Sequence, residues 1–199
     1  MKRKLLTVLL ISWALVFGPF LPSLSAQWLV VLAGSTPIAS NSPWITAQAI
    51  GTARNNATLE VGIAFTVGGS NLTVKELGRW VLSGNSSTHV LNLCSGTVGG
   101  TRTVLGTVTV NTSGAGAGAY LYGTLSSSVT LTASTTYFLF SAETNGGDQW
   151  SDDVGTTITT NTSVASPRAS HSAAYWDGAS ITIATDGPAH LYGPVNFKY

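Results

Sequence analysis

The stretch Leu59-Glu-Val-Gly-Ile-Ala-Phe-Thr-Val67 alternates large apolar residues with small or polar ones. A period of two places successive side chains on opposite faces of a strand, so this segment predicts a β-strand with one buried face. The same alternation recurs at Val104, Gly106, Val108 and Val110, where threonines fill the outward positions. We therefore expect a fold built from strands.

Other segments have a similar composition and are separated by turn-forming residues. The further strands we expect lie at residues 44–50, 72–82, 88–94, 119–125, 129–131, 136–143, 156–160, 180–185 and 194–199. Asn145-Gly146-Gly147 and Asp177-Gly178 supply the positive φ that tight turns require. Gly-Ala-Gly-Ala-Gly at 114–118 is expected to be a hairpin tip. Many short strands and no convincing helix predict an all-β, antiparallel β-sandwich that is jelly-roll-like.

The N-terminus has the three parts of a secretory signal peptide. Lys2, Arg3 and Lys4 precede thirteen apolar residues, and small residues follow, so cleavage is expected after Ser25 or Ala26. A membrane span needs about 20 apolar residues, more than this run holds. We expect residues 1–26 to be a signal peptide, 27–43 a lead-in segment and 44–199 the β-sandwich domain. The mature chain is expected to lack a membrane span and to be secreted or at the cell surface.

The net charge and the cysteine content limit the kinds of partner that we expect the chain to bind. Three of the nine basic residues lie in the leader, which leaves a mature net charge of −2. Nucleic-acid binding rests on basic residues that neutralise phosphates, so no nucleic-acid partner is expected. Cys94 is the only cysteine. It therefore forms no internal disulfide, and is either buried as a small hydrophobe or paired with another chain.

Several blocks resemble a known type of domain. The longest is Leu77-Gly-Arg-Trp-Val-Leu-Ser-Gly-Asn-Ser-Ser-Thr-His-Val-Leu-Asn-Leu93, and others are residues 50–55, 143–150 and 192–199. They are similar to blocks of an uncharacterised family of exported bacterial β-sandwich domains, which serve as accessory modules of secreted and surface proteins. The resemblance spans about residues 44–199. It implies a β-sandwich and an accessory binding role, and it carries no established activity.

Half of the acidic residues of the chain lie between Glu143 and Asp153. Calcium takes about six to eight oxygen ligands, and Glu143, Asp148, Asp152 and Asp153 are candidates to supply some of them. The spacing matches neither an EF-hand loop nor the calcium-binding nonapeptide repeat. The alternatives are a solvated turn shaped by Asn145-Gly146-Gly147, or direct contact with a ligand.

The same region has the composition of a sugar site. Apolar sugar faces stack on aromatic rings, while sugar hydroxyls bind planar polar side chains. The candidate ligand-binding residues combine these types in two places, and they are Asp148, Gln149, Trp150, Trp176 and Asp177. If Trp150 is an exposed binding residue, Trp150→Ala should weaken retention on a polysaccharide without lowering thermal stability. The alternative is that these tryptophans are buried in the core.

The remaining charged residues are expected to have structural roles. Arg54 and Arg79 should pair with carboxylates, Glu60 and Glu76 being the first candidates, and His89 should be a partly buried, hydrogen-bonded histidine. There is no Gly-x-Ser-x-Gly or His-Glu-x-x-His motif, so we do not expect an enzyme.

These observations lead to two functional hypotheses. The first is a secreted, noncatalytic binding module for carbohydrate or another extracellular polymer, with calcium as its candidate cofactor. The second is a structural protein of the cell surface or matrix that associates with itself through exposed strand edges.

Overall fold

Thirteen strands and no helix make up the residues described by the computed structural model, which are 41–152, 154–161, 171–183, 192 and 195–199. In chain order they are β1 (Ile45–Ala49), β2 (Ala53–Arg54), β3 (Leu59–Thr66), β4 (Leu72–Trp80), β5 (Thr88–Gly96), β6 (Arg102–Asn111), β7 (Tyr120–Leu131), β8 (Thr136–Glu143), β9 (Trp150–Ser151), β10 (Thr157–Thr160), β11 (His171–Trp176), β12 (Ile181–Ile183) and β13 (Val195–Lys198). These strands belong to one compact unit, Pro37–Tyr199.

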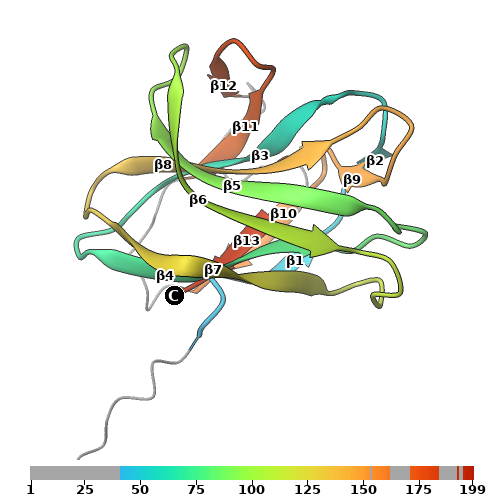
Figure 1. Ribbon diagram of the computed structural model, residues 1–199, viewed down its shortest axis with the longest axis horizontal. Helices are drawn as coiled ribbons and strands as arrows, with labels where there is room; N and C mark the ends of the chain where they lie inside the picture. Colours follow the sequence, from blue (N-terminus) through green and yellow to red (C-terminus); the bar gives the residue numbers. More distant parts are fainter. Residues whose placement is uncertain (1–40, 153, 162–170, 184–191, 193–194) are drawn as a thin grey trace, which may run out of the picture. The chain divides into compact units, whose positions relative to one another are not determined.

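The strands form sheets that pack face to face (Figure 1). One sheet has the order β12-β11-β3-β8-β5-β6, and the opposite sheet has the order β13-β4-β7. The pair β1–β10 adjoins β13, because the backbone N–H of Trp44 donates to the carbonyl of Phe197 at 2.9 Å. Every paired strand is antiparallel to its neighbours. The predicted all-β sandwich is confirmed, whereas its jelly-roll refinement is not.

The main core lies between the two sheets. Alternate residues of β3, including Ile63 and Phe65, face it together with Leu77 of β4. Trp44 stacks on Phe197 with a ring-centroid separation of 5.0 Å. Large aromatic rings bury much apolar surface, so this cluster supplies a large share of the hydrophobic stabilisation.

A second core covers the other face of the six-stranded sheet. Its buried members are Ala64, Cys94, Phe138, Phe140, Ala174 and Ile181. The connection between β5 and β6 folds over them, with a bridge from Val98 to Ile181, and the Arg102 guanidinium lies over the Phe140 ring. Burial raises the pKa of the Cys94 thiol to about 12, so this cysteine is a neutral core residue.

The expectation that β3 buries only one face was wrong. Ala64 alternates with Ile63 and Phe65, yet all three are buried, because both faces of the sheet are covered. The strand His171–Trp176 was not predicted for the same reason. Ala173 and Ala174 are both buried in it, so the segment lacks an apolar–polar alternation.

Most other expected elements are confirmed. The strand at 136–143 has the predicted bounds, and the two segments at 119–125 and 129–131 form one strand, β7. The hairpin-tip prediction for residues 114–118 was wrong: this segment belongs to the loop that leads from β6, at the edge of one sheet, to β7 in the opposite sheet, and Gly114 has a φ of 74°. The pairs β2 and β9, of two residues each, were too short for a periodic signal.

The signal-peptide prediction, residues 1–26, lies outside the described residues. The end of the lead-in segment pairs with the C-terminus, because Ser42 exchanges backbone hydrogen bonds with Tyr199 and Pro43 bridges Lys198. Among the described residues there is no helix of the length and apolarity that a membrane crossing requires.

Candidate functional site

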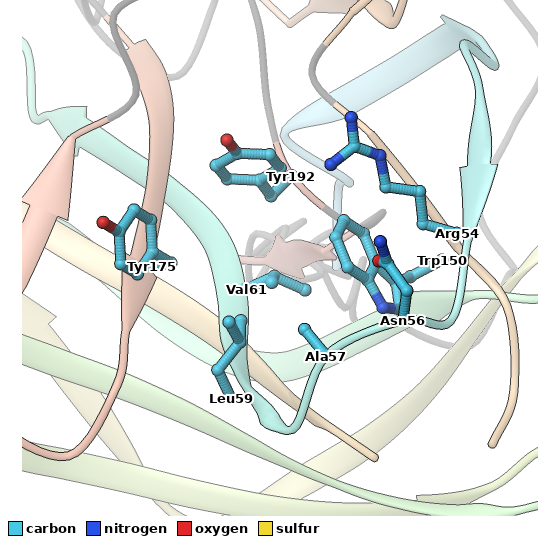
Figure 2. A pocket seen from close by; sticks show the side chains of 8 residues that line it. All are labelled: Arg54, Asn56, Ala57, Leu59, Val61, Trp150, Tyr175 and Tyr192. Carbon is cyan, nitrogen blue, oxygen red and sulfur yellow. The ribbon is translucent and has the colours of Figure 1, made fainter. Parts of the chain in front are cut away.

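A pocket of about 200 Å³ lies at the start of β3, beside Leu59 and Val61, which are not part of the main core. Its lining combines aromatic, apolar and polar side chains from β2, β3, β9, β11 and the segments beside them: Arg54, Asn56, Ala57, Leu59, Val61, Trp150, Tyr175 and Tyr192 (Figure 2). We call this the aromatic pocket.

Strand pairing explains why these side chains meet. Val61 of β3 lies directly opposite Tyr175 of β11, and Arg54 of β2 lies directly opposite Trp150 of β9. Directly opposed residues of antiparallel strands project to the same face. Two cross-strand pairs therefore place a phenol, an indole and a guanidinium around one space.

Three rings form a row along the pocket. Tyr192 is 5.9 Å from Trp150 and 6.3 Å from Tyr175, measured between ring centroids, and both contacts are edge-to-face. The backbone N–H of Tyr192 donates to the carbonyl of Gly62 at 3.0 Å, which ties this segment to β3. In Figure 2, Trp150, Asn56 and Arg54 group at one end of the pocket, and Leu59 and Tyr175 lie at the other.

Trp150 is a wall of the pocket and also a buried residue. It is 3% exposed, and its Nε1–H has no hydrogen-bond acceptor among the described residues. Truncating it would therefore remove packing as well as a ring for stacking. This corrects the expectation that Trp150→Ala would leave thermal stability unchanged.

Trp150 lies in the segment between Glu143 and Asp153, which we call the acidic loop. Buried hydrogen bonds of Asp148 hold this loop in place. Asp148 is buried and accepts hydrogen bonds from the backbone N–H groups of Ser86 and Ser87, the hydroxyl of Thr112 and the Nε2 of His89, at 2.7–3.0 Å. Burial raises the pKa of this carboxyl, but the hydrogen bonds from Thr112, His89, Ser86 and Ser87 outweigh it, so the pKa lies well below its usual range. Asp148 thus fixes the loop to the β4–β5 turn as a carboxylate.

Glu143 and Arg79 form a buried ion pair between the two sheets. Arg79 of β4 is fully buried, and its Nε and Nη2 donate to the two carboxylate oxygens of Glu143 on β8, each at 3.0 Å. Nη2 also donates to the carbonyl of Gln149 at 3.1 Å. The pairing expected for arginine is present, but its partner is Glu143 rather than Glu60 or Glu76.

His89 completes this buried network. Its Nδ1 lies 3.0 Å from the carbonyl oxygen of Ala142, and its Nε2 lies 3.0 Å from Asp148 Oδ2. Each ring nitrogen of His89 therefore faces an oxygen that accepts hydrogen bonds. The expectation of a hydrogen-bonded structural histidine is confirmed.

The structure separates the two aromatic–acid pairs seen in the sequence. Trp176 follows Tyr175 on β11 and projects to the opposite face, where the Arg102 guanidinium lies 4.8 Å from its ring centroid. Trp176 and Asp177 line a second, more open groove that includes Glu60. Asp177 is exposed and accepts hydrogen bonds from the backbone of Ala179 and Ser180, which lower its pKa.

Of the predicted ligand-binding residues, only Trp150 lines the aromatic pocket. The side chain of Gln149 is exposed, and its backbone carbonyl accepts hydrogen bonds from the side chains of Arg79 and Asn85. The carboxylate of Asp148 accepts hydrogen bonds from other residues of the protein. The pocket residues that the prediction missed include Arg54, Asn56, Tyr175 and Tyr192. Period-two alternation along β11 would have separated Tyr175 from Trp176, had that strand been recognised.

The calcium site stays a prediction. Glu143 pairs with Arg79, Asp148 accepts protein hydrogen bonds, and the buried Asp152 pairs with Arg54, while Asp153 lies outside the described residues. Within the described part of the chain, no three His, Cys, Asp or Glu residues gather as metal ligands. The reading of these carboxylates as solvating groups was wrong for Glu143, Asp148 and Asp152, which are all buried.

No protein-family model, curated protein or solved structure matches this chain. The resemblance to exported bacterial β-sandwich modules therefore stays a prediction.

Proposed function

We propose that this protein is a secreted, noncatalytic binding module whose ligand is a carbohydrate and whose binding site is the aromatic pocket. The observation that carries the proposal is the row of Trp150, Tyr192 and Tyr175 beside Arg54 and Asn56 in one pocket. This pocket replaces the earlier pairing of Trp150 with Trp176 as the proposed binding surface.

The chemistry of the lining favours a sugar. Aromatic rings offer flat apolar surfaces for the C–H faces of a pyranose, and the exposed Asn56 and Arg54 offer planar hydrogen-bonding groups to its hydroxyls. Pockets that enclose drug-sized ligands measure roughly 300–1,000 Å³. A pocket of about 200 Å³ suits one ring or one chain end of a larger polymer.

The lining favours binding over hydrolysis. The eight lining residues that belong to the described part of the chain include no carboxylate, histidine, cysteine or serine. Glycoside hydrolysis ordinarily requires two carboxyl groups that flank the scissile bond. The nearby carboxylate of Asp152 is buried and paired with Arg54, which leaves it a positioning role.

Tyr175→Ala tests this proposal, because Tyr175 is only partly buried and its removal takes one ring from the row. We expect the wild-type chain to be retained on at least one polysaccharide of a broad glycan array, and Tyr175→Ala to bind that glycan about tenfold more weakly. Trp80→Ala is the matched control, since Trp80 is also partly buried but packs against Tyr120 on the opposite sheet. Equal losses in both variants, or no retained glycan for the wild type, would contradict the proposal.

Self-association is the second candidate, and one edge of the sandwich favours it. β6 ends the six-stranded sheet and exposes Val104 and Leu105, at 46% and 37%. Exposed apolar edge strands are sites of strand addition. If β6 mediates assembly, light scattering should show oligomers at high concentration that Val104→Lys converts to monomers. A monomeric wild type would contradict it.

A further inference from the structure

We infer that the aromatic pocket selects an acidic sugar unit, a uronic acid or a similar carboxylate-bearing ring, which Arg54 binds. This inference rests on the proposed function and specifies the class of sugar. It begins from the charges of the lining residues that the structure describes, among which Arg54 is the charged one. A carboxylate that enters the pocket therefore meets a cation in this part of the lining.

The ion pair of Arg54 presents its positive member to solvent. The side chain of Arg54 is 43% exposed, whereas that of its partner Asp152 is 2% exposed. Asp152 is also fixed by its backbone, because its N–H donates to the carbonyl of Thr52 at 2.7 Å. The buried carboxylate thus orients the guanidinium, and the accessible face of the pair is cationic.

The guanidinium retains unused donors. Asp152 contacts Nη2 of Arg54, while Nη1 and Nε have no partner among the described residues. Arginine presents five N–H donors in a planar fork that matches the two oxygens of a carboxylate. One monodentate contact therefore leaves donors for a second carboxylate.

The aromatic rings and the Arg54 guanidinium lie close enough together to contact one ligand. Arg54 is the cross-strand partner of Trp150, and Trp150 contacts Tyr192. Figure 2 shows the Arg54 guanidinium at the same end of the pocket as the Trp150 ring, with the Tyr192 ring between that end and Tyr175. A sugar ring that stacks on the partly buried Tyr192, beside Trp150, would bring a carboxylate substituent to Arg54, as a uronic acid does.

The overall charge gives no long-range attraction that would mimic this preference. If the leader is removed, the net charge is −2, which disfavours anionic polymers at a distance. Preference for an acidic sugar must therefore arise by contact at Arg54. An exposed charge pair weakens as salt rises.

The test compares oligouronates with their methyl esters, which have the same rings without the charge. Affinities of the full-length chain for galacturonate, glucuronate and mannuronate oligomers and for their esters are measured by calorimetry at low and high salt. We expect at least one acid to bind about fivefold to tenfold more tightly than its ester at low salt. Arg54→Gln should abolish this ratio, and Arg54→Lys, which keeps a cation beside Asp152, should reduce it.

Lys75→Gln is the control, because it makes the same change in net charge on β4 of the opposite sheet and should preserve the ratio. Equal binding of acid and ester by the wild type overturns the inference and leaves the proposed function standing. Loss of the ratio in Lys75→Gln as well as Arg54→Gln overturns it in favour of a general charge effect. If the chain binds neutral glycans but none of these acids, the inference fails alone. If it binds no glycan of either kind, both proposals fail.

Discussion

At the scale of single residues, the buried, bidentate pair of Arg79 and Glu143 links the two sheets. Removing one partner from a buried ion pair leaves an uncompensated charge and costs about 3–5 kcal/mol. We expect Glu143→Gln to lower the free energy of unfolding by about 3 kcal/mol, measured by urea denaturation. Because Arg79 also donates to the carbonyl of Gln149, the same change should loosen the loop that carries Trp150.

The pair of Lys198 and Glu76 provides the control for that prediction. Its N–O distance is 2.7 Å, but its side chains are 25% and 15% exposed. Exposed pairs contribute about 0–1 kcal/mol, so Lys198→Gln should cost about 1 kcal/mol or less. If both variants lose equal stability, burial of the Arg79–Glu143 pair is not the cause.

Asp148 predicts how stability depends on pH. Its pKa in the folded chain lies below the unfolded value, which is about 3.9 for an aspartate. Its contribution is therefore complete above the unfolded pKa and is lost as pH falls toward the folded pKa. We expect Asp148→Asn to be destabilised near neutral pH, and the difference from wild type to shrink as pH falls below about 4.

Melting temperatures from pH 7 to pH 2 check this expectation. Asp177→Asn is the control, because Asp177 is exposed and its lowered pKa comes from backbone hydrogen bonds of its own turn. That variant should change the acid dependence less. An unchanged difference between Asp148→Asn and wild type across this range would contradict the assigned role of Asp148.

At the scale of elements, the central strand β3 admits no side chain at Gly62. A Cβ there would overlap the carbonyl oxygen of Leu139 on β8, and Gly62 also accepts the hydrogen bond that holds Tyr192. We expect Gly62→Ala to cost about 2–3 kcal/mol, as overpacking does. Thermal denaturation checks it against Gly116→Ala in the loop between β6 and β7, where an added Cβ meets nothing within 4 Å. Equal stability of the two variants would show that β3 and β8 separate readily.

The same strands show what sequence reasoning can reach. Periodicity and turn residues located β3, β5 and β8, because a half-polar strand and a glycine turn leave local signals. The strand β11 left no such signal. Because the second core covers one of its faces, both Ala173 and Ala174 are buried. Its omission also concealed the pocket, because Tyr175 becomes a neighbour of Val61 only through strand pairing.

At the scale of the whole domain, long-range contacts decide the role of the acidic loop. Local composition indicated that Trp150 and four nearby acidic residues form a functional cluster. It gave no sign of the ion pairs that Glu143 forms with Arg79 and that Asp152 forms with Arg54. It also gave no sign that the backbone N–H groups of Ser86 and Ser87 donate hydrogen bonds to Asp148. Those partners are 60 to 100 residues away along the chain, so the loop's function as a support for Trp150 emerges only from the folded structure.

The central claim is that the aromatic pocket binds the ligand, and the indole N–H signals in an NMR titration with a retained glycan test it most directly. Trp150 is assigned from Trp150→Phe, and Trp80 and Trp176 lie on other faces of the domain. We predict that the Trp150 signal shifts in proportion to bound glycan, while the signals of Trp80 and Trp176 stay in place. A bound glycan that shifts Trp176 or Trp80 and leaves Trp150 unchanged would contradict the account.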